Sequence, residues 1–284
     1  MATVAALWIA HSEWSSTYQL FLHHSVLGLS IHEWINDGWM AFFFFVVGME
    51  IKYELIEGEL SDFRKALLPL GAAIGGMVVP ALIYSLLNQG EVSLRGWGIP
   101  MATDIAFAVG VLSFFGKRLP LGLKVFLLAL AIVDDLGAVL VIAFFYTSQL
   151  KWMYLVFALG IILALVGRYR WCSRGRSRVS HGSPHGSHEL VDLPIRQETA
   201  RKRFSYFTLF AMLCAIGLWW CFFKSGVHAT LAGVVLGLLM PVHSPAHITN
   251  IRFPLTVGNF IHRLHPWVSF LIMPLFAFAN AGVS

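Results

Sequence analysis

Three acidic residues lie inside two neighbouring apolar segments of this 284-residue chain. Asp104 belongs to the segment 95–116, and Asp134 and Asp135 belong to the segment 121–146. Each segment is long enough to cross a bilayer, which takes about 20 helical residues. A carboxylate at that depth is costly unless it faces water, a cation or a partner. The three acids therefore indicate an intramembrane site, although for any single one of them a structural hydrogen-bonding role is the alternative.

A proline interrupts the first of these segments. Pro100 has no backbone N–H and drives the preceding residue towards extended geometry, whereas Thr103 and Asp104 are residue types that begin helices. We predict a discontinuous transmembrane helix here, and broken backbone at that depth is tolerated only inside protein or beside water. Carbonyl groups, the Thr103 hydroxyl and the carboxylates would then form an all-oxygen site for a small cation.

Asp134 and Asp135 are adjacent, so on a helix they point about 100° apart. One of them can face a cavity while the other faces a neighbouring helix. The spacing therefore allows the two carboxylates to have different roles.

The composition indicates a polytopic membrane protein. Of the residues, 57% are hydrophobic and 12% are charged, whereas about 25% of the residues of a soluble domain are charged. The net charge of +5 does not indicate nucleic acid, because the basic residues lie in loops between apolar segments. The three cysteines have no metal-ligand spacing, and no cofactor is expected.

The remaining apolar segments must position the acids. We predict an all-α helical bundle that forms one transmembrane domain over residues 1–284. Its other spans are 33–51, 66–88, 152–168, 204–222, 226–241 and the segment from His265 to the end. Gly71, Gly75 and Gly76 give the span 66–88 a small-residue face suited to close helix packing.

The intervening stretches are predicted as loops. Residues 1–10 resemble the tail of a helix, and residues 11–32 and 242–264 are predicted to be loops. Residues 169–203 are rich in Arg, Ser, Gly and His, which favours a flexible linker over a metal site formed by the three histidines. Seventeen of the 20 lysine and arginine residues fall on one side of the predicted bundle, so that side, with the loop 169–203, is predicted to be cytoplasmic.

Four stretches of the sequence are similar to the NhaA family of bacterial sodium/proton antiporters. They are residues 96–107 (GWGIPMATDIAF), 130–138 (LAIVDDLGA), 224–233 (KSGVHATLAG) and 274–284 (PLFAFANAGVS). They occur in the order of the family. The resemblance runs from about residue 30 to the end of the chain, apart from the loops.

The resemblance implies roles for individual residues. Asp135 corresponds to the carboxylate that binds Na+ and exchanges it for protons, and Asp134 to its partner, which a lysine on a later helix holds in the family. Thr103 and Asp104 correspond to the crossing point of two broken helices. Glu50 and His228 correspond to positions linked to pH response, although a plain helix-start packing role is the alternative for His228.

The family continues beyond the stretch that ends this sequence. The resemblance implies three further spans there, which complete a second inverted repeat and supply the basic partner of Asp134. The sequence is therefore expected to be truncated at both ends, and activity of this chain alone is not expected.

The function implied is electrogenic exchange of Na+ or Li+ for protons across the bacterial inner membrane. The exchange serves pH and Na+ homeostasis, in a multi-pass protein that lies in the lipid bilayer and for which a homodimer is one assembly to consider. It is not an enzymatic activity. Two alternatives stay open: a sodium-coupled solute symporter of similar fold, and an intramembrane aspartyl protease. The protease is disfavoured because neither acid-bearing segment has a Gly-x-Gly-Asp sequence.

Overall fold

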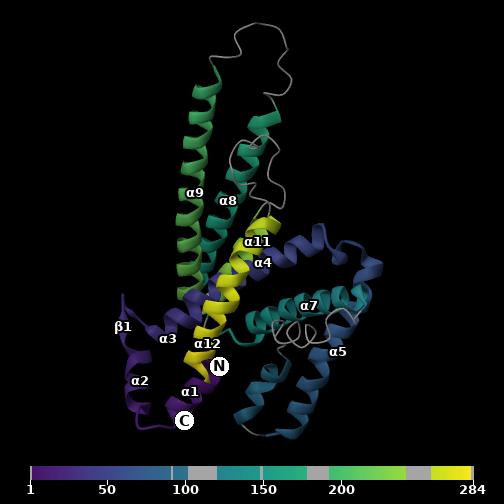
Figure 1. Cartoon of the computed structure of the whole chain (residues 1–284), viewed down its shortest axis with the longest axis vertical. Coiled ribbons are helices and arrows are strands. Elements are labelled where there is room, and N and C mark those ends of the chain that lie inside the picture. The colour runs from purple at the N-terminus through teal and green to yellow at the C-terminus, as the bar shows by residue number, and fades with distance from the viewer. Residues whose placement is uncertain are drawn as a thin grey trace. The chain divides into compact units, whose positions relative to one another are not determined.

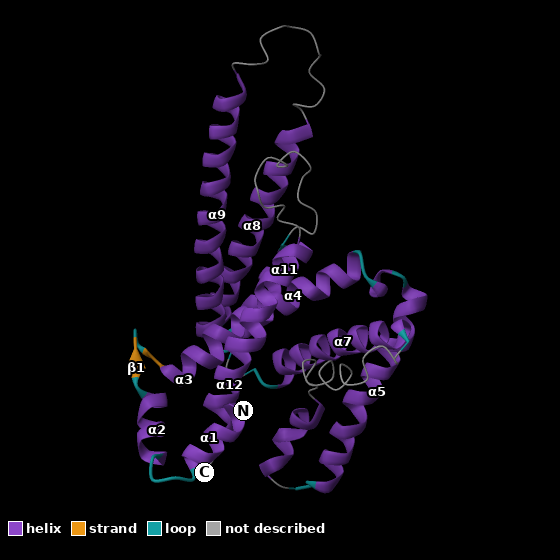
Figure 2. Cartoon of the chain, viewed as in Figure 1, coloured by secondary structure: helices purple, strands orange, loops and turns teal. Residues whose placement is uncertain are grey.

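Helices account for almost all of the described structure (Figure 2). The computed structural model describes residues 2–90, 92–101, 120–147, 150–177, 192–240 and 257–282. The chain forms two compact units, one made of Met1–Ser148 with His228–Ser284 and the other of Gln149–Val227. The prediction of a mostly helical membrane protein is confirmed in this coarse form.

The first unit contains the helices that carry most of the predicted site. Its N-terminal elements are α1 (Ala2–Ala10), α2 (Ser15–His23), β1 (Ser25–Val26), β2 (Leu29–Ser30), α3 (Ile31–Glu33), the π-helix η1 (Trp34–Trp39) and α4 (Met40–Ile56). Its later elements are the 3-10 helix η2 (Glu59–Ser61), α5 (Phe63–Leu87), the 3-10 helix η3 (Val92–Met101), α7 (Leu121–Phe145), α10 (Thr230–Leu239), α11 (Val257–Trp267), the π-helix η5 (Val268–Ile272) and α12 (Met273–Ala281).

Residues 11–32 are not the loop that the sequence suggested. Nine residues of this stretch form α2, whose buried side chains Tyr18 and Leu22 lie one turn apart and pack with Ile35 and Ala279. Both partners lie outside the stretch, and one of them is more than 250 residues away, so the local sequence gave little sign of this helix. The loop prediction is therefore wrong here.

A short hairpin follows α2. Val26 pairs with Leu29 in the antiparallel strands β1 and β2. The two residues of the turn, Leu27 and Gly28, have φ angles of 55° and 84°. Positive φ at both positions is typical of the tight turns that join antiparallel strands, and the glycine accepts it without steric cost.

The end of the second predicted loop is also helical. Within 242–264, residues from Val257 onward form α11, which continues through η5 and α12. Val257, Phe260, Ile261 and Leu264 recur at the spacing of one helix face and pack in the core around Met49 of α4. The polar residues between these positions led to the loop prediction, although the apolar spacing is that of a helix.

Helices α4 and α10 approach each other through glycines. A Cβ at Gly48 would lie 2.6 Å from the Val234 carbonyl oxygen, and one at Gly233 or Gly237 would overlap backbone atoms of α4. No side chain fits between the helices at these points, so the two backbones lie in direct contact. Since Gly233 lies beside Ala41 and Gly237 beside Gly48, the helices run parallel.

A lysine fastens the end of this pair. The Lys52 ammonium donates hydrogen bonds to the carbonyl oxygens of Leu238 (2.7 Å) and Met240 (2.6 Å). These carbonyls belong to the last turn of α10, whose acceptors have no partner within the helix. A cation at a helix C-terminus is also favoured by the helix dipole.

The pair α5 and α7 is packed differently. A Cβ at Gly71, Gly75 or Gly76 would meet no described atom within 4 Å, so these glycines make no close helix contact among the described residues, and their close-packing face stays a prediction. Instead η3 lies across the two helices. The Tyr84 hydroxyl of α5 donates to the Ser93 carbonyl oxygen (2.9 Å).

The other side of η3 is fastened to the end of α7. The backbone N–H of Gly98 donates to the Tyr146 hydroxyl oxygen (3.1 Å). Pro100 lies within η3, and residues 102–119 lie outside the described residues. The discontinuous helix therefore stays a prediction.

A neutral amide pair joins η1 to α12. The Asn280 side-chain amide donates to the Asn36 side-chain oxygen (2.8 Å), and the Asn36 amide donates back to Asn280 (3.3 Å). Nearby, the Tyr18 hydroxyl donates to the Phe278 carbonyl oxygen. Because Asn280 lies at the end of α12 and Gly258 of α11 lies near Tyr53 of α4, the segment α11–α12 runs antiparallel to η1–α4.

The second unit is a helical hairpin of α8 (Trp152–Ser177) and α9 (Asp192–Ser225), which lie side by side in Figure 1. The Lys151 N–H donates to the Ser225 carbonyl oxygen (2.9 Å), and Arg168 lies over the Phe210 ring (5.2 Å). Both helices extend into the stretch 169–203, so the loop expectation is wrong at its two edges. Residues 178–191 lie outside the described residues.

Within the first unit, α4 and α10 run in one direction and the segment α11–α12 runs in the other. Among the described residues, three helical stretches are long and apolar enough to cross a membrane: Phe63–Leu87, Trp152–Arg170 and Val257–Ala281.

Candidate functional site

Helix α7 carries two of the predicted site residues. Its 25 residues begin directly after Pro120, contain no proline and are almost entirely apolar. Asp134 lies in the middle of this helix and is only 5% exposed. The sequence-based expectation of an acid buried at mid-helix is met by this residue.

Asp134 follows a run of buried apolar residues on α7. The three preceding residues, Ala131, Ile132 and Val133, are buried as well. Ile132 packs with Val47 and Ile51 of α4. No described residue donates a hydrogen bond to the Oδ2 atom of Asp134. A buried carboxylate oxygen without a donor is costly, and such groups in proteins usually serve a proton, an ion or water.

Asp135 occupies a less enclosed position. Its side chain is half-buried, about 100° around α7 from that of Asp134. The two carboxylates therefore differ in burial, which is compatible with the different roles that their adjacency allows.

Glu50 lies on the helix that packs against α7. It is half-buried on α4 and lies between the buried residues Met49 and Ile51. Since it follows Val47 by three residues, it lies roughly 60° around the helix from the side chain that packs towards α7. The structure thus places Glu50 on α4, the helix that packs against the acid-bearing helix α7.

His228 lies elsewhere. It is exposed, and its carbonyl oxygen accepts a hydrogen bond from the Leu231 N–H at the start of α10 (3.1 Å). Because α10 runs parallel to α4, His228 lies near the beginning of α4, whereas Glu50 lies near its end, on the order of 15 Å along the axis. The two residues that the resemblance links to pH response are therefore not brought together.

Thr103 and Asp104 lie outside the described residues. Their part in the site stays a prediction. In the described part of the chain, no group of three or more His, Cys, Asp or Glu residues is placed to hold a metal ion.

Sequence reasoning missed the role of Lys52. In the sequence, Lys52 directly follows the predicted span 33–51, where a charged residue is expected at the edge of the membrane. The signal that identifies its role is its position one turn after Gly48, which places both residues on the face of α4 that contacts α10. A lysine on the same face as a close-packing glycine can reach the end of the neighbouring helix.

The fold and the site define a class: a multi-pass α-helical membrane protein with a carboxylate buried among apolar side chains. The sequence profile of the family described as Na+/H+ antiporter 1 matches residues 1–178 and 195–284. The chain belongs to this family.

Individual relatives agree with this assignment. The chain is 44% identical over 293 residues to the Na(+)/H(+) antiporter NhaA 2 of Clostridium beijerinckii, an alignment that covers 100% of this chain and 63% of the relative. It is 46% identical over 292 residues to the Na(+)/H(+) antiporter NhaA of Yersinia enterocolitica, covering 100% of this chain and 65% of the relative. The chain thus spans less than two thirds of the length of these relatives.

Proposed function

We propose that this chain carries the ion-exchanging site of an electrogenic antiporter that expels Na+ or Li+ in exchange for protons. The proposal places the protein in the inner membrane of a bacterium, where the exchange serves pH and Na+ homeostasis. Family membership and the names of the relatives support it.

The observation that carries the proposal is the buried carboxylate of Asp134. Its Oδ2 atom receives no hydrogen bond from the described residues, and the three residues that precede it on α7 are buried and apolar. An ionised carboxylate in such surroundings is unfavourable unless a cation or a proton accompanies it. Protons and a sodium ion would therefore compete for the same oxygen atoms, and this competition is the chemical basis of exchange.

The two acids of α7 take different parts in this scheme. Asp135, which is half-buried, binds the dehydrated cation and releases it when protonated. Asp134 is its partner, which in the family is held by a lysine on a later helix. Thr103 and Asp104 complete the oxygen set at the predicted helix break.

Transport follows from alternating access. The deprotonated carboxylates take up a cation from the cytoplasm, the loaded bundle turns to face outward, and protons displace the ion there. More protons than cations move in each cycle, so the membrane voltage drives transport together with the pH gradient. Glu50 and His228 adjust the response to pH from the two ends of the α4–α10 pair.

The ions are the cargo, and the proposal includes no resident cofactor. The lipid bilayer is the surrounding partner, and the proposed assembly in it is a homodimer. Because the two pH-response residues lie apart, each is expected to shift the pH profile by itself.

The test is sodium-dependent dissipation of a pH gradient, followed with a pH-sensitive dye, in proteoliposomes that hold a full-length version of the protein, because activity of this chain alone is not expected. Asp135→Asn removes the charge without changing the side-chain size, and it is expected to abolish the dissipation caused by Na+ or Li+. Chromatographic elution in detergent should be unchanged, because Asp135 is only half-buried.

Glu13→Gln is the matched control. Glu13 is an exposed carboxylate between α1 and α2, and its removal should leave exchange unchanged. Undiminished exchange by the Asp135→Asn variant would refute the assignment of the site.

A further inference from the structure

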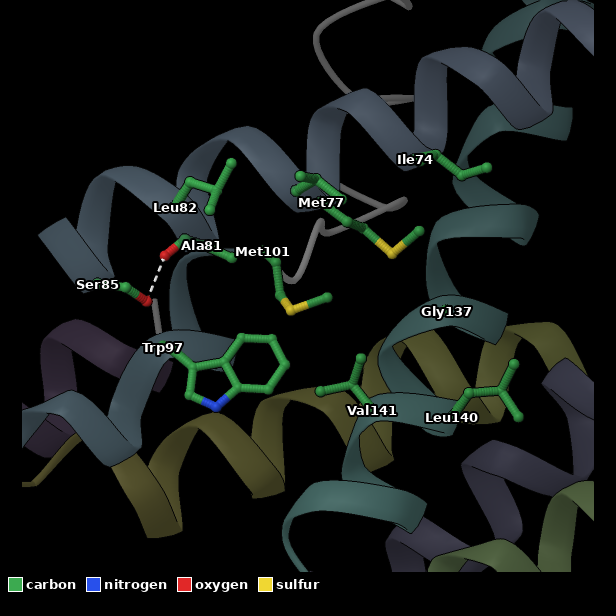
Figure 3. A pocket seen from close by; sticks show the side chains of 11 residues that line it. Ile74, Met77, Ala81, Leu82, Ser85, Trp97, Met101, Gly137, Leu140 and Val141 are labelled. Carbon is green, nitrogen blue, oxygen red and sulfur yellow. Dashed lines mark hydrogen bonds between the residues drawn. The ribbon is translucent and has the colours of Figure 1, made fainter.

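Titratable side chains gather where η1 begins. His32 and Glu33 end α3, Asp37 lies on η1, and the half-buried His32 precedes Asn36 by four residues, one helical turn. The side chains drawn in Figure 3, between α5, η3 and α7, include no titratable group. Among the described side chains, a change of pH can therefore act at the start of η1 but not in the pocket of Figure 3.

The orientation of the Asn36 amide is fixed by its neighbours. The Asn280 side-chain nitrogen donates to the Phe276 carbonyl oxygen (2.9 Å), which can only accept. The same nitrogen donates to one atom of the Asn36 amide (2.8 Å), so that atom is the oxygen and the other is the nitrogen. The Asn36 nitrogen lies 3.3 Å from the Asn280 oxygen and 3.2 Å from Nε2 of His32. One of its two N–H groups therefore serves Asn280, and the other needs an acceptor on the His32 ring.

His32 can accept this second N–H only while its ring is neutral. The Asn36 nitrogen lies 3.3 Å from Nδ1 as well as 3.2 Å from Nε2, so either neutral tautomer presents an acceptor to it. The charged ring carries an N–H group on both nitrogens and has no acceptor. Protonation therefore brings two donors face to face. Histidine is the side-chain type whose charge changes between about pH 5 and pH 8.

The carboxylates around His32 favour the charged ring instead. Glu33 and Asp37 both lie within electrostatic reach of it. The elements packed around this region contribute further titratable groups: Tyr18 and His23 of α2, His24 directly after α2, and His228 directly before α10. Helix α12, which packs against η1, carries none. A charged His32 thus loses the amide and is attracted by two carboxylates.

We propose that His32 is a proton-dependent switch on the contact between η1 and α12. At pH 8 the neutral ring accepts from Asn36 and completes the contact with Asn280. As the pH falls through the titration range of histidine, the charged ring turns towards the carboxylates and the contact weakens. Because η1 continues into α4, which packs against the acid-bearing helix α7, the switch acts on a helix beside the candidate site.

The switch is exposed to one side of the membrane. His32 directly precedes the predicted span 33–51, whereas Lys52 follows it on the side that is predicted to be cytoplasmic. His32 therefore responds to the acidity outside the cell, from which the proposed exchange takes its protons. Only this link to transport rests on the proposed function, because the contact itself needs no ion exchange.

The experiment is hydrogen exchange of the last turn of α12 in a purified full-length version of the protein. It is followed by mass spectrometry at about pH 5.5 and pH 8, with each rate corrected for intrinsic exchange at that pH. The wild-type protein is expected to exchange about fivefold faster at the lower pH, because a hydrogen bond is lost. The measurement involves no transport, so its outcome does not depend on the proposed function.

Two variants fix the hydrogen-bonding character of position 32. His32→Gln offers an acceptor at every pH, so the protection of α12 should no longer depend on pH. His32→Arg offers no acceptor at any pH, and its α12 should exchange quickly at both pH values. His23→Gln is the matched control, because His23 is an exposed histidine at the end of α2 and its loss should leave the wild-type pH dependence in place.

Three results would overturn the proposal. Equal protection of wild-type α12 at both pH values would do so, and this comparison requires no variant. A folded His32→Gln protein that keeps the wild-type pH dependence would also do so. Loss of the pH dependence in His23→Gln would assign it to the neighbouring histidine instead of His32.

Discussion

Two helix pairs of the same unit, α4 with α10 and α5 with α7, both contain several glycines on one of their helices. In the first pair a Cβ at Gly233 would overlap the Ala41 carbonyl oxygen, whereas in the second a Cβ at Gly75 would meet no described atom within 4 Å. A glycine in a transmembrane sequence therefore does not by itself indicate a close helix contact. The backbones of α4 and α10 are in direct contact, whereas no described residue packs against the glycines of α5.

The largest effect is expected when a glycine of each pair is replaced by alanine, which adds one methyl group. Gly233→Ala should destabilise the protein by about 3 kcal/mol, because the new Cβ overlaps backbone that cannot move aside. Gly75→Ala should instead stabilise it by about 0.5–1 kcal/mol, since alanine is the better helix former.

Thermal unfolding in detergent, followed by size-exclusion chromatography, measures both variants. Equal shifts in the melting temperature would show that the two glycines do not differ in their packing.

The second prediction concerns Lys52, whose hydrogen bonds join α4 to the end of α10. Lys52→Met keeps most of the side-chain length but loses both hydrogen bonds to the end of α10, at a cost of about 1–2 kcal/mol. Lys52→Arg should recover most of the loss, because the guanidinium also donates to carbonyl groups. Hydrogen exchange of the last turn of α10 is the measurement. Faster exchange in Lys52→Met alone is expected, and unchanged exchange would mean that the lysine contributes little.

The third prediction lies on α7. Asp134→Asn should raise the stability by about 1 kcal/mol, because it replaces a buried ionisable group by a neutral one. The same variant should exchange Na+ for protons more slowly. The melting temperature at pH 8 and the rate of dissipation of the pH gradient measure the two effects. A fall in stability would indicate that Asp134 has a hydrogen-bond donor that the structure does not describe.

The last prediction concerns Tyr18, which lies outside both pairs. Burial raises the pKa of its phenol, which donates to the Phe278 carbonyl oxygen. The folded state therefore keeps this proton to higher pH than the unfolded state, and stability is lost as the pH rises above about 10. Tyr18→Phe should cost about 1 kcal/mol at neutral pH and should flatten the decline above pH 10. Denaturant unfolding from pH 8 to pH 11 measures both.

Much of the helical frame could be predicted from the sequence, because long apolar runs require a helix in a membrane whatever their neighbours are. Helices α5 and α7 begin and end within a few residues of the predicted spans. Helix α2 could not be predicted in this way, since Tyr18 and Leu22 are buried by residues distant in sequence.

The candidate site could also be predicted only in part from the sequence. The adjacency of Asp134 and Asp135 allowed different surroundings for them, and in the structure Asp134 is buried whereas Asp135 is half-buried. The packing partner of each helix could not be predicted, because it depends on shape across the bundle. For that reason the separation of Glu50 from His228 became visible only in three dimensions.

The reciprocal amide contact between Asn36 and Asn280 has a consequence for a protein proposed to work across a range of acidity. Neither amide gains or loses a proton at any physiological pH, so the bond between η1 and α12 carries no charge of its own. The Asn36 amide also lies 3.2 Å from Nε2 of His32, so a charge on that ring would act on the contact through Asn36.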